Sequence, residues 1–100
     1  MQVYNISFQI APSLELQWLQ WMKEKFIPLI VSTACFEQNK LYQLEVDAEQ
    51  APTYTLQLFT SQAAQLAEYL QKHDSLILQE LSATWGDQCF YFATKMKIVN

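Results

Sequence analysis

The stretch from Leu14 to Phe26 constrains the fold most, because it places two of the three tryptophans of the chain on one side of a helix. At about 100° per residue, its large apolar side chains fall on one broad arc and its polar side chains on the opposite arc. The apolar arc comprises Leu14, Trp18, Leu19, Trp21, Met22 and Phe26. We predict an amphipathic helix whose aromatic face packs into the core, and we prefer this interpretation to an aromatic ligand site.

Both ends of this helix are marked in the sequence. Ser13 follows Pro12 and is expected to cap the first turn by accepting backbone N–H bonds. Pro28 lacks a backbone N–H and disfavours helical geometry at Ile27. The helix is therefore expected to kink or restart at this point and to end near Ser32.

The remaining secondary structure follows from apolar periodicity and from turn residues. Alternation predicts strands at Val3–Ile10, Cys35–Asp47 and Thr53–Thr60, and an aromatic last strand at Gln88–Val99. A second helical region runs from Gln62 through Lys72 to Leu81, with Ser61 as its expected N-cap and Gly86 as its terminating glycine. The order β-α-β-β-α-β predicts a single α+β domain, residues 1–100, of ferredoxin-like fold, with both helical regions on one face of a four-stranded antiparallel sheet.

Composition excludes several functions. The formal net charge is −4, all six basic residues are lysines and the only glycine is Gly86. Without arginine or a basic stripe we expect no nucleic-acid partner, and without a glycine-rich loop we expect no nucleotide chemistry. Cys35 and Cys89 should lie on opposite edges of the sheet as reduced thiols, since two cysteines so spaced form neither a zinc motif nor a disulfide framework. We expect no metal and no cofactor.

The same chain carries neither a basic leader nor a long apolar segment, so a cytoplasmic protein without membrane contact is the expectation. Apolar residues make up 51% of the chain and aromatic residues 14%, which is rich for 100 residues and favours an oligomer.

The sheet face that the helices leave open is the candidate functional surface. We predict that it carries mostly uncharged polar side chains: Asn5, Ser7, Gln9, Gln43, Glu45, Thr55, Gln57, Phe59, Tyr91 and Lys95. A solvated face would usually carry more Lys and Glu, so we predict a face-to-face homodimer around a small cavity rather than an exposed face. The candidate ligand-binding residues are Asn5, Ser7, Gln43, Thr55, Gln57 and Tyr91, for a small and partly apolar molecule.

Several short motifs together resemble a family of short uncharacterised bacterial proteins that is known only as a domain of unknown function. They are Trp18-Leu-Gln-Trp-Met-Lys, Ile27-Pro28, Ala34-Cys-Phe36, Pro52-Thr-Tyr54 and Trp85-Gly-Asp87. The family usually has glycine at position 35 and phenylalanine at position 85, where this chain has Cys35 and Trp85. More loosely, the family is similar to the dimeric α+β barrel superfamily, which implies two ferredoxin-like chains with paired open faces around a cavity.

That superfamily includes cofactor-free monooxygenases, haem-degrading enzymes, isomerases and small sensor proteins, so the resemblance implies an assembly without naming a reaction. In its haem-degrading members an asparagine on the first strand and a histidine on the second helix flank the substrate. Asn5 and His73 lie in comparable elements here and are the candidate catalytic pair, although Ala63 and Ala64 stand where those enzymes have a tryptophan. A lone histidine beside a helix cap, as His73 is beside Asp74, is more commonly a surface or capping residue.

Other candidate chemistry is weaker. Glu45 and Asp47 could act as an acid and a base on one strand face, but charged residues on an edge strand more commonly prevent aggregation. Cys35 has no histidine nearby in the sequence and is expected to be an inert thiol. We therefore predict a homodimeric binding module with a small cavity, and keep a cofactor-independent monooxygenase or haem-binding enzyme as the alternative.

Overall fold

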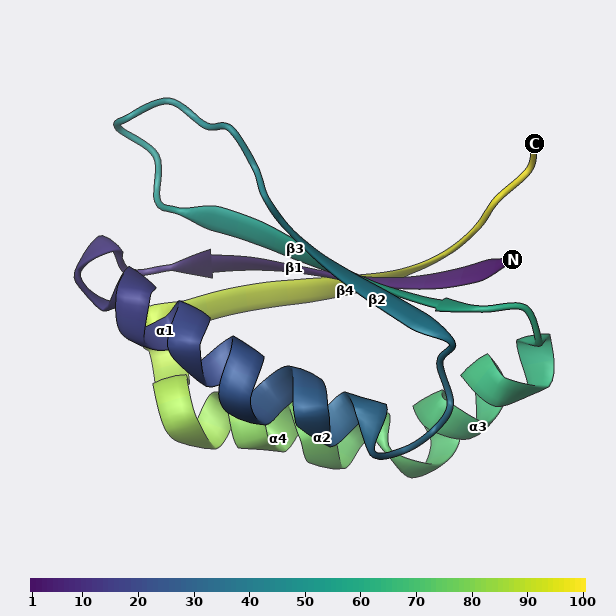
Figure 1. Ribbon diagram of the computed structural model, residues 1–100. Helices are drawn as coiled ribbons and strands as arrows, with labels where there is room; N and C mark the ends of the chain where they lie inside the picture. Colours follow the sequence, from purple (N-terminus) through teal and green to yellow (C-terminus); the bar gives the residue numbers. More distant parts are fainter.

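The computed structural model describes residues 1–100 and has two layers, a four-stranded antiparallel sheet and a layer of helices (Figure 1). The strands are β1 (Gln2–Ile10), β2 (Gln38–Gln43), β3 (Thr53–Thr60) and β4 (Cys89–Lys97), in the spatial order β2-β3-β1-β4. The helices are α1 (Glu15–Trp21), α2 (Ile27–Val31), α3 (Ala63–Lys72) and α4 (Asp74–Trp85). All helices lie on one face of the sheet, which confirms the predicted ferredoxin-like α+β fold and its two edge strands.

The strand register fixes which side chains face the helices. Ile6 of β1 lies opposite Leu56 of β3 and opposite Ala93 of β4, and side chains alternate from this row along each strand. On the two central strands the helix-facing side chains are buried: Tyr4, Ile6, Phe8 and Ile10 on β1, and Tyr54, Leu56, Leu58 and Thr60 on β3. The prediction of which side chains on these two strands face the core is therefore confirmed.

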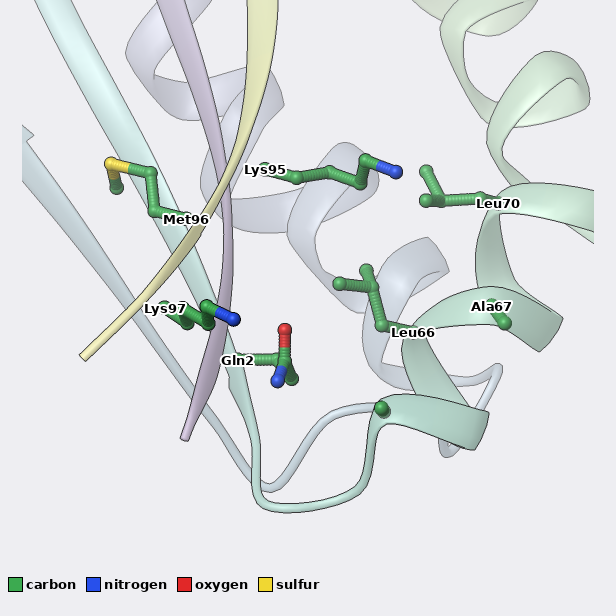
Figure 2. A pocket seen from close by; sticks show the side chains of 8 residues that line it. Gln2, Leu66, Ala67, Leu70, Lys95, Met96 and Lys97 are labelled. Carbon is green, nitrogen blue, oxygen red and sulfur yellow. The ribbon is translucent and has the colours of Figure 1, made fainter. Parts of the chain in front are cut away.

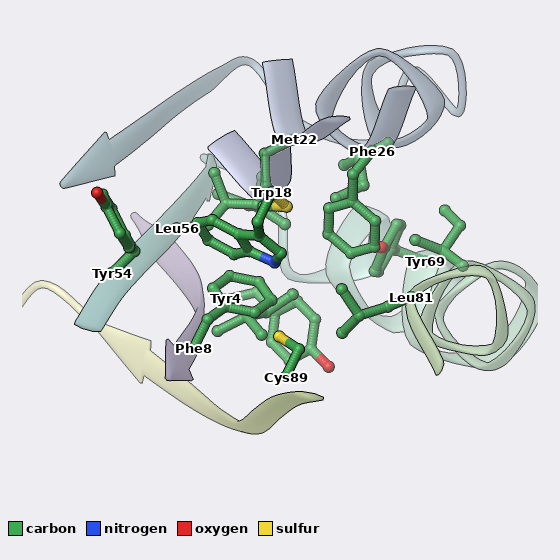
Figure 3. Close-up of a cluster of buried hydrophobic side chains, with 14 of the residues drawn as sticks. Tyr4, Phe8, Trp18, Met22, Phe26, Tyr54, Leu56, Tyr69, Leu81 and Cys89 are labelled. Atoms are coloured by element: carbon green, nitrogen blue, oxygen red, sulfur yellow. The ribbon is translucent and has the colours of Figure 1, made fainter. Parts of the chain in front are cut away.

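Trp18 lies at the centre of the core between the helices and the sheet (Figure 3). It has no solvent exposure. Its ring packs edge-on against the ring of Phe8, with 5.2 Å between the ring centroids, and lies tilted against the ring of Tyr54, with 5.1 Å between the centroids. Trp21 is only partly buried and packs on the ring of Trp85 at 5.8 Å. The predicted aromatic face does pack into the core, and Trp18 is the largest of its fully buried side chains.

Near Pro28 the first helical region continues without a break. Residues Met22–Phe26 form a π-helical turn in which the Ile27 N–H donates to the Met22 carbonyl, five residues earlier. This wider turn gives room for the proline ring and removes the need for the missing Pro28 N–H. Regular α-helix then restarts at Ile27, which confirms the predicted restart.

Two predicted caps are wrong and one helix stop is confirmed. Ser13 makes no capping hydrogen bond, since the chain enters α1 through the 3-10 turn Pro12–Leu14. Ser61 bonds to the Glu37 carboxylate through its N–H and its hydroxyl, and α3 begins at Ala63. Gly86 adopts a positive φ of 56° at the end of α4, a conformation that favours glycine.

The second strand is shorter than predicted. It starts at Gln38 and ends at Gln43, so Glu45 and Asp47 lie in an exposed loop, Leu44–Pro52, and do not share a strand face. The Leu44 N–H makes the last hydrogen bond to β3, at 2.9 Å to the Thr53 carbonyl, and a turn then runs from Asp47 to Gln50. Cys35 precedes β2 and Cys89 begins β4, and both are free, as predicted.

Candidate functional site

The open face of the sheet is defined by the side chains that alternate with the buried rows. They are Val3, Asn5, Ser7 and Gln9 on β1; Thr53, Thr55, Gln57 and Phe59 on β3; Gln38, Lys40 and Tyr42 on β2; and Phe90, Phe92, Thr94 and Met96 on β4. Lys40 is the only charged residue among them. A face with so little charge is unusual for a surface left in water.

A closed set of hydrogen bonds lies at the centre of this face. The Thr55 hydroxyl donates to Asn5 Oδ1 at 2.7 Å, Asn5 Nδ2 donates to Ser7 Oγ at 3.3 Å, and the Ser7 and Thr55 hydroxyls are 3.4 Å apart. Because the three side chains satisfy one another, they form a polar but uncharged centre that needs little water. We call Asn5, Ser7 and Thr55 the central polar cluster.

A hollow of about 280 Å³ adjoins the central polar cluster. Its open-face lining is formed by Ser7, Gln9, Leu44, Thr53, Phe90 and Phe92. Phe90 and Phe92 are 65% and 56% exposed, so their rings remain available to a further partner. The hollow therefore offers aromatic surface on one side and hydroxyl and amide groups on the other.

Most large apolar side chains that remain exposed belong to this side of the molecule. They are Tyr42, Phe90, Phe92 and Met96 on the strands, Leu44 and Val46 in the loop after β2, and Met1, Ile98 and Val99 at the chain ends. Figure 1 shows that this loop and the C-terminal segment both rise on the side away from the helices, at opposite ends of the sheet. Exposed apolar residues therefore lie along the open face and at both of its ends.

Some predicted site residues lie on the other face. Gln43 pairs with the buried Tyr54, and Tyr91 pairs with the buried Phe8, so both side chains belong to the helix side. Lys95 is on the helix side for the same reason. The predictions for these three residues are wrong, whereas Asn5, Ser7, Thr55 and Gln57 do share the open face.

The aromatic part of the site, Phe90 and Phe92, was missed by the sequence analysis. Phe90, Tyr91 and Phe92 are consecutive, so alternation alone does not say which of them faces the helices. The pairing with β1 decides which face each takes, and local sequence does not encode that pairing. Phe92 lies opposite Ser7 of the open face, and Tyr91 lies opposite the buried Phe8.

His73 is separated from Asn5 by the sheet. It lies at the junction of α3 and α4, its ring is 6.1 Å from that of the buried Tyr69, and it borders a hollow with Leu29 and Glu80 in the helix layer. Asn5 points to the open face. The structure does not bring the candidate catalytic pair together within one chain.

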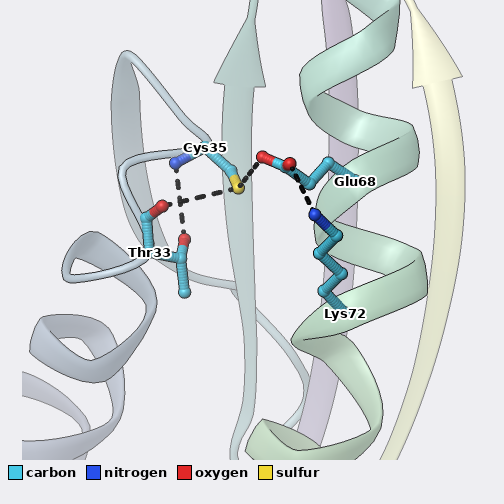
Figure 4. A network of polar contacts seen from close by, with 4 residues as sticks. All are labelled: Thr33, Cys35, Glu68 and Lys72. Carbon is cyan, nitrogen blue, oxygen red and sulfur yellow. Dashed lines mark hydrogen bonds and ion pairs between the residues drawn. The ribbon is translucent and has the colours of Figure 1, made fainter.

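Cys35 is buried beside α3 (Figure 4). Its thiol lies 3.6 Å from the Thr33 carbonyl and 4.0 Å from Glu68, whose carboxylate pairs with Lys72 at 3.1 Å. The sulfur makes hydrogen bonds to a carbonyl and a carboxylate but to no imidazole, so the thiol–imidazole pair of many cysteine nucleophiles is not formed here. No three histidine, cysteine, aspartate or glutamate side chains cluster as a metal site.

Three tyrosines have raised pKa values in the folded chain. Burial and the bond from the Tyr4 hydroxyl to Asp74 Oδ1 at 2.8 Å raise the pKa of Tyr4 well above its usual range. Burial also raises the pKa of Tyr69, and burial with a bond to the Glu15 carboxylate raises the pKa of Tyr54 to about 12. Desolvation raises the pKa of Asp74 and brings that of Cys89 to about 11.

Alkaline pH is therefore expected to destabilise the fold. The folded chain binds the protons of these phenols and of Cys89 more tightly than the unfolded chain, whose groups titrate near 9.0 and 10.0. Through these groups the free energy of unfolding should change little between about pH 7 and pH 9 and fall as the pH rises further. Urea midpoints across this range test the effect, and Tyr54→Phe should make the decline shallower. Equal midpoints at pH 8 and pH 11 would contradict it.

The geometry defines this protein as a ferredoxin-like α+β domain with one sheet face uncovered. Residues 1–99 match the domain of unknown function DUF4286, and the chain belongs to that family. The family predicted from the sequence motifs is thereby confirmed as a domain of unknown function. None of the curated proteins matches the chain, and no helix is both long and apolar enough to cross a membrane.

Solved structures with the same fold cover almost the whole chain. An EthD family protein from Bacillus halodurans is 9% identical, with a TM-score of 0.71 over 98% of this chain and 100% of its own. A variant of SnoaB, a cofactor-independent oxygenase from Streptomyces nogalater, is 10% identical (TM-score 0.65; 99% and 93% covered). A dimeric ferredoxin-like protein from an uncultured marine organism is 9% identical (TM-score 0.60; 99% and 94% covered). At such identities the likeness concerns the fold alone.

Proposed function

We propose that this chain is a homodimeric binding module in which two copies pair their open sheet faces and enclose a small cavity. The observation that carries this proposal is the concentration of exposed apolar side chains on one nearly uncharged face. Monomeric proteins rarely leave a contiguous apolar patch of this kind in water, and such patches usually mark interfaces or ligand sites. The dimeric state of the marine ferredoxin-like protein of the same fold supports the same arrangement.

The exposed apolar side chains of this face supply a substantial part of the area that a stable interface needs. A standard interface buries about 800 Å² per partner, and one aromatic side chain supplies about 150–250 Å² when it is buried completely. Phe90, Phe92 and Tyr42 retain roughly half of that area, and Leu44, Val46 and Met96 add aliphatic surface beside them. Desolvating this face costs little because only Lys40 carries a charge on it.

The ligand that fits the hollow is small, flat and uncharged, with one or two groups that form hydrogen bonds. The rings of Phe90 and Phe92 provide stacking surface, and Gln9 and Thr53 provide an amide and a hydroxyl at the rim. No ionised side chain lines the hollow, so a charged ligand would remain unpaired there.

A cofactor-independent oxygenase is the second candidate, favoured by the fold shared with SnoaB and by the aromatic lining of the same hollow. In this reading Asn5 is the polar side chain that orients the substrate. His73 lies on the far side of the sheet, so His73→Ala should leave oxygen consumption unchanged, whereas Asn5→Ala should reduce it.

We also propose a cytoplasmic location, which the free thiols of Cys35 and Cys89 support because a reducing compartment preserves thiols. An acidic chain without arginine does not favour nucleic acid as a partner.

Native mass spectrometry of the protein from its own host tests the proposal. We expect a species of twice the 11.7 kDa chain mass at micromolar concentration, with a small additional mass that is lost on denaturation. A monomer without added mass at that concentration would contradict the homodimer and the enclosed cavity together.

A further inference from the structure

Lysines occupy two helix-facing positions at the end of the edge strand β4. In the register, Lys95 lies opposite Tyr4 and Lys97 opposite Gln2, so both side chains are on the helix side of the sheet. The corresponding rows of β1 and β3 are largely apolar and buried. Two cations at the end of such a row call for a physical account beyond core packing.

Beside these lysines is a groove of about 370 Å³ between α3 and the strands β1 and β4. Leu66 and Leu70 form its apolar floor, and Ala63 and Ala67 on the same helix are too small to fill it. Figure 2 shows Lys95 extending from β4 toward Leu70, while Met96 between the two lysines points away. The groove therefore has aliphatic walls and ammonium groups at its opening.

The charges around this groove are unbalanced. No carboxylate lines it, and the one ion pair of the chain joins Lys72 to Glu68. Lys95 and Lys97 are thus unpaired cations in a chain of net charge −4. Lysine residues that face inward can protect an edge strand from aggregation, but this role needs no apolar groove beside them.

We propose that the groove between α3 and β4 binds a single-chain aliphatic carboxylate. The hydrocarbon chain lies along Leu66 and Leu70, where it displaces water from apolar surface. The carboxylate head lies between the ammonium groups of Lys95 and Lys97, with the Gln2 amide as a further donor. The volume lies within the range of about 300–1,000 Å³ that is typical of small-molecule sites. This site is on the helix side of the sheet and does not depend on the open face.

The first test is a titration with dodecanoate, kept below micelle formation, followed by amide NMR shifts. We expect saturable shifts on α3 and on the end of β4. An exposed ion pair contributes up to about 1 kcal/mol, or about fivefold in affinity. Lys95→Gln with Lys97→Gln removes two such pairs and should therefore weaken binding by up to about 25-fold. The matched control, Lys23→Gln with Lys25→Gln, removes the same charge elsewhere and should leave affinity unchanged.

A second pair of variants tests the apolar floor. Ala67→Leu fills the groove and should abolish the shifts, whereas Ala64→Leu adds the same bulk on α3 outside the groove and should preserve them. The proposal is overturned if dodecanoate shows no saturable binding, if its shifts map to Phe90 and Phe92 on the open face, or if the double lysine variant binds as tightly as the natural chain.

Discussion

Trp18→Ala is expected to lower the free energy of unfolding by about 3–5 kcal/mol, the range that is typical of large aromatic residues removed from a core. Trp18 is fully buried, and its ring contacts Phe8 and Tyr54 at 5.2 and 5.1 Å. The deletion leaves a cavity between the helix layer and the sheet, which the flanking strands cannot close without breaking their register. For a domain at the lower end of the usual range of about 5–15 kcal/mol, a loss of about 5 kcal/mol unfolds about half of the population.

Urea unfolding followed by circular dichroism measures this loss. Leu16→Ala is the matched control, because Leu16 is on the same helix, α1, but is 81% exposed. It should change stability by no more than about 0.5 kcal/mol. The loss of unfolding free energy in Trp21→Ala should lie between the losses in these two variants, since Trp21 is partly buried against Trp85. Equal midpoints for Trp18→Ala and Leu16→Ala would mean that the aromatic face of the first helical region does not form the core.

The central strands could be predicted from the sequence because their alternation of apolar and polar residues is compatible with only one buried face. On β1 the large apolar residues Tyr4, Ile6, Phe8 and Ile10 alternate with polar ones, so only one face can be buried. The sequences of the edge strands do not determine which side chains face the helices. β4 carries three consecutive aromatic residues from Phe90, followed by lysines on the helix side, and its phase is set by its pairing with β1. Tertiary register, which local alternation does not encode, decides that phase.

The candidate site could be predicted in part for the same reason. Asn5, Ser7 and Thr55 are on central strands, and the structure brings them within hydrogen-bond distance of one another. The aromatic half of the hollow comes from an edge strand and was therefore assigned to the wrong face. His73 was grouped with Asn5 by resemblance of elements, but a sheet lies between them, which a one-dimensional comparison does not show.

Phe92→Glu is expected to raise the dissociation constant of the homodimer by at least about 100-fold. If the open faces pair, Phe92 becomes buried in both copies, and the variant removes that apolar contact twice. It also places two carboxylates in a water-poor interface. Lys40, the only cation on the open face, lies on the opposite edge strand of the same chain, and unpaired charge in such a place costs several kcal/mol. Gln57→Glu should weaken the dimer less, because Gln57 is paired directly with Lys40 on β2.

Sedimentation equilibrium across nanomolar to micromolar concentrations measures this change. Leu76→Glu is the matched control, because Leu76 is a similarly exposed apolar residue, 65% against 56% for Phe92, on the outer helix layer. Both variants should fold, since neither side chain is buried in the single chain, and circular dichroism checks this. Dissociation by Phe92→Glu alone would place the interface on the open face. Equal dissociation constants for the two variants would exclude pairing through that face and leave its apolar residues to a different partner.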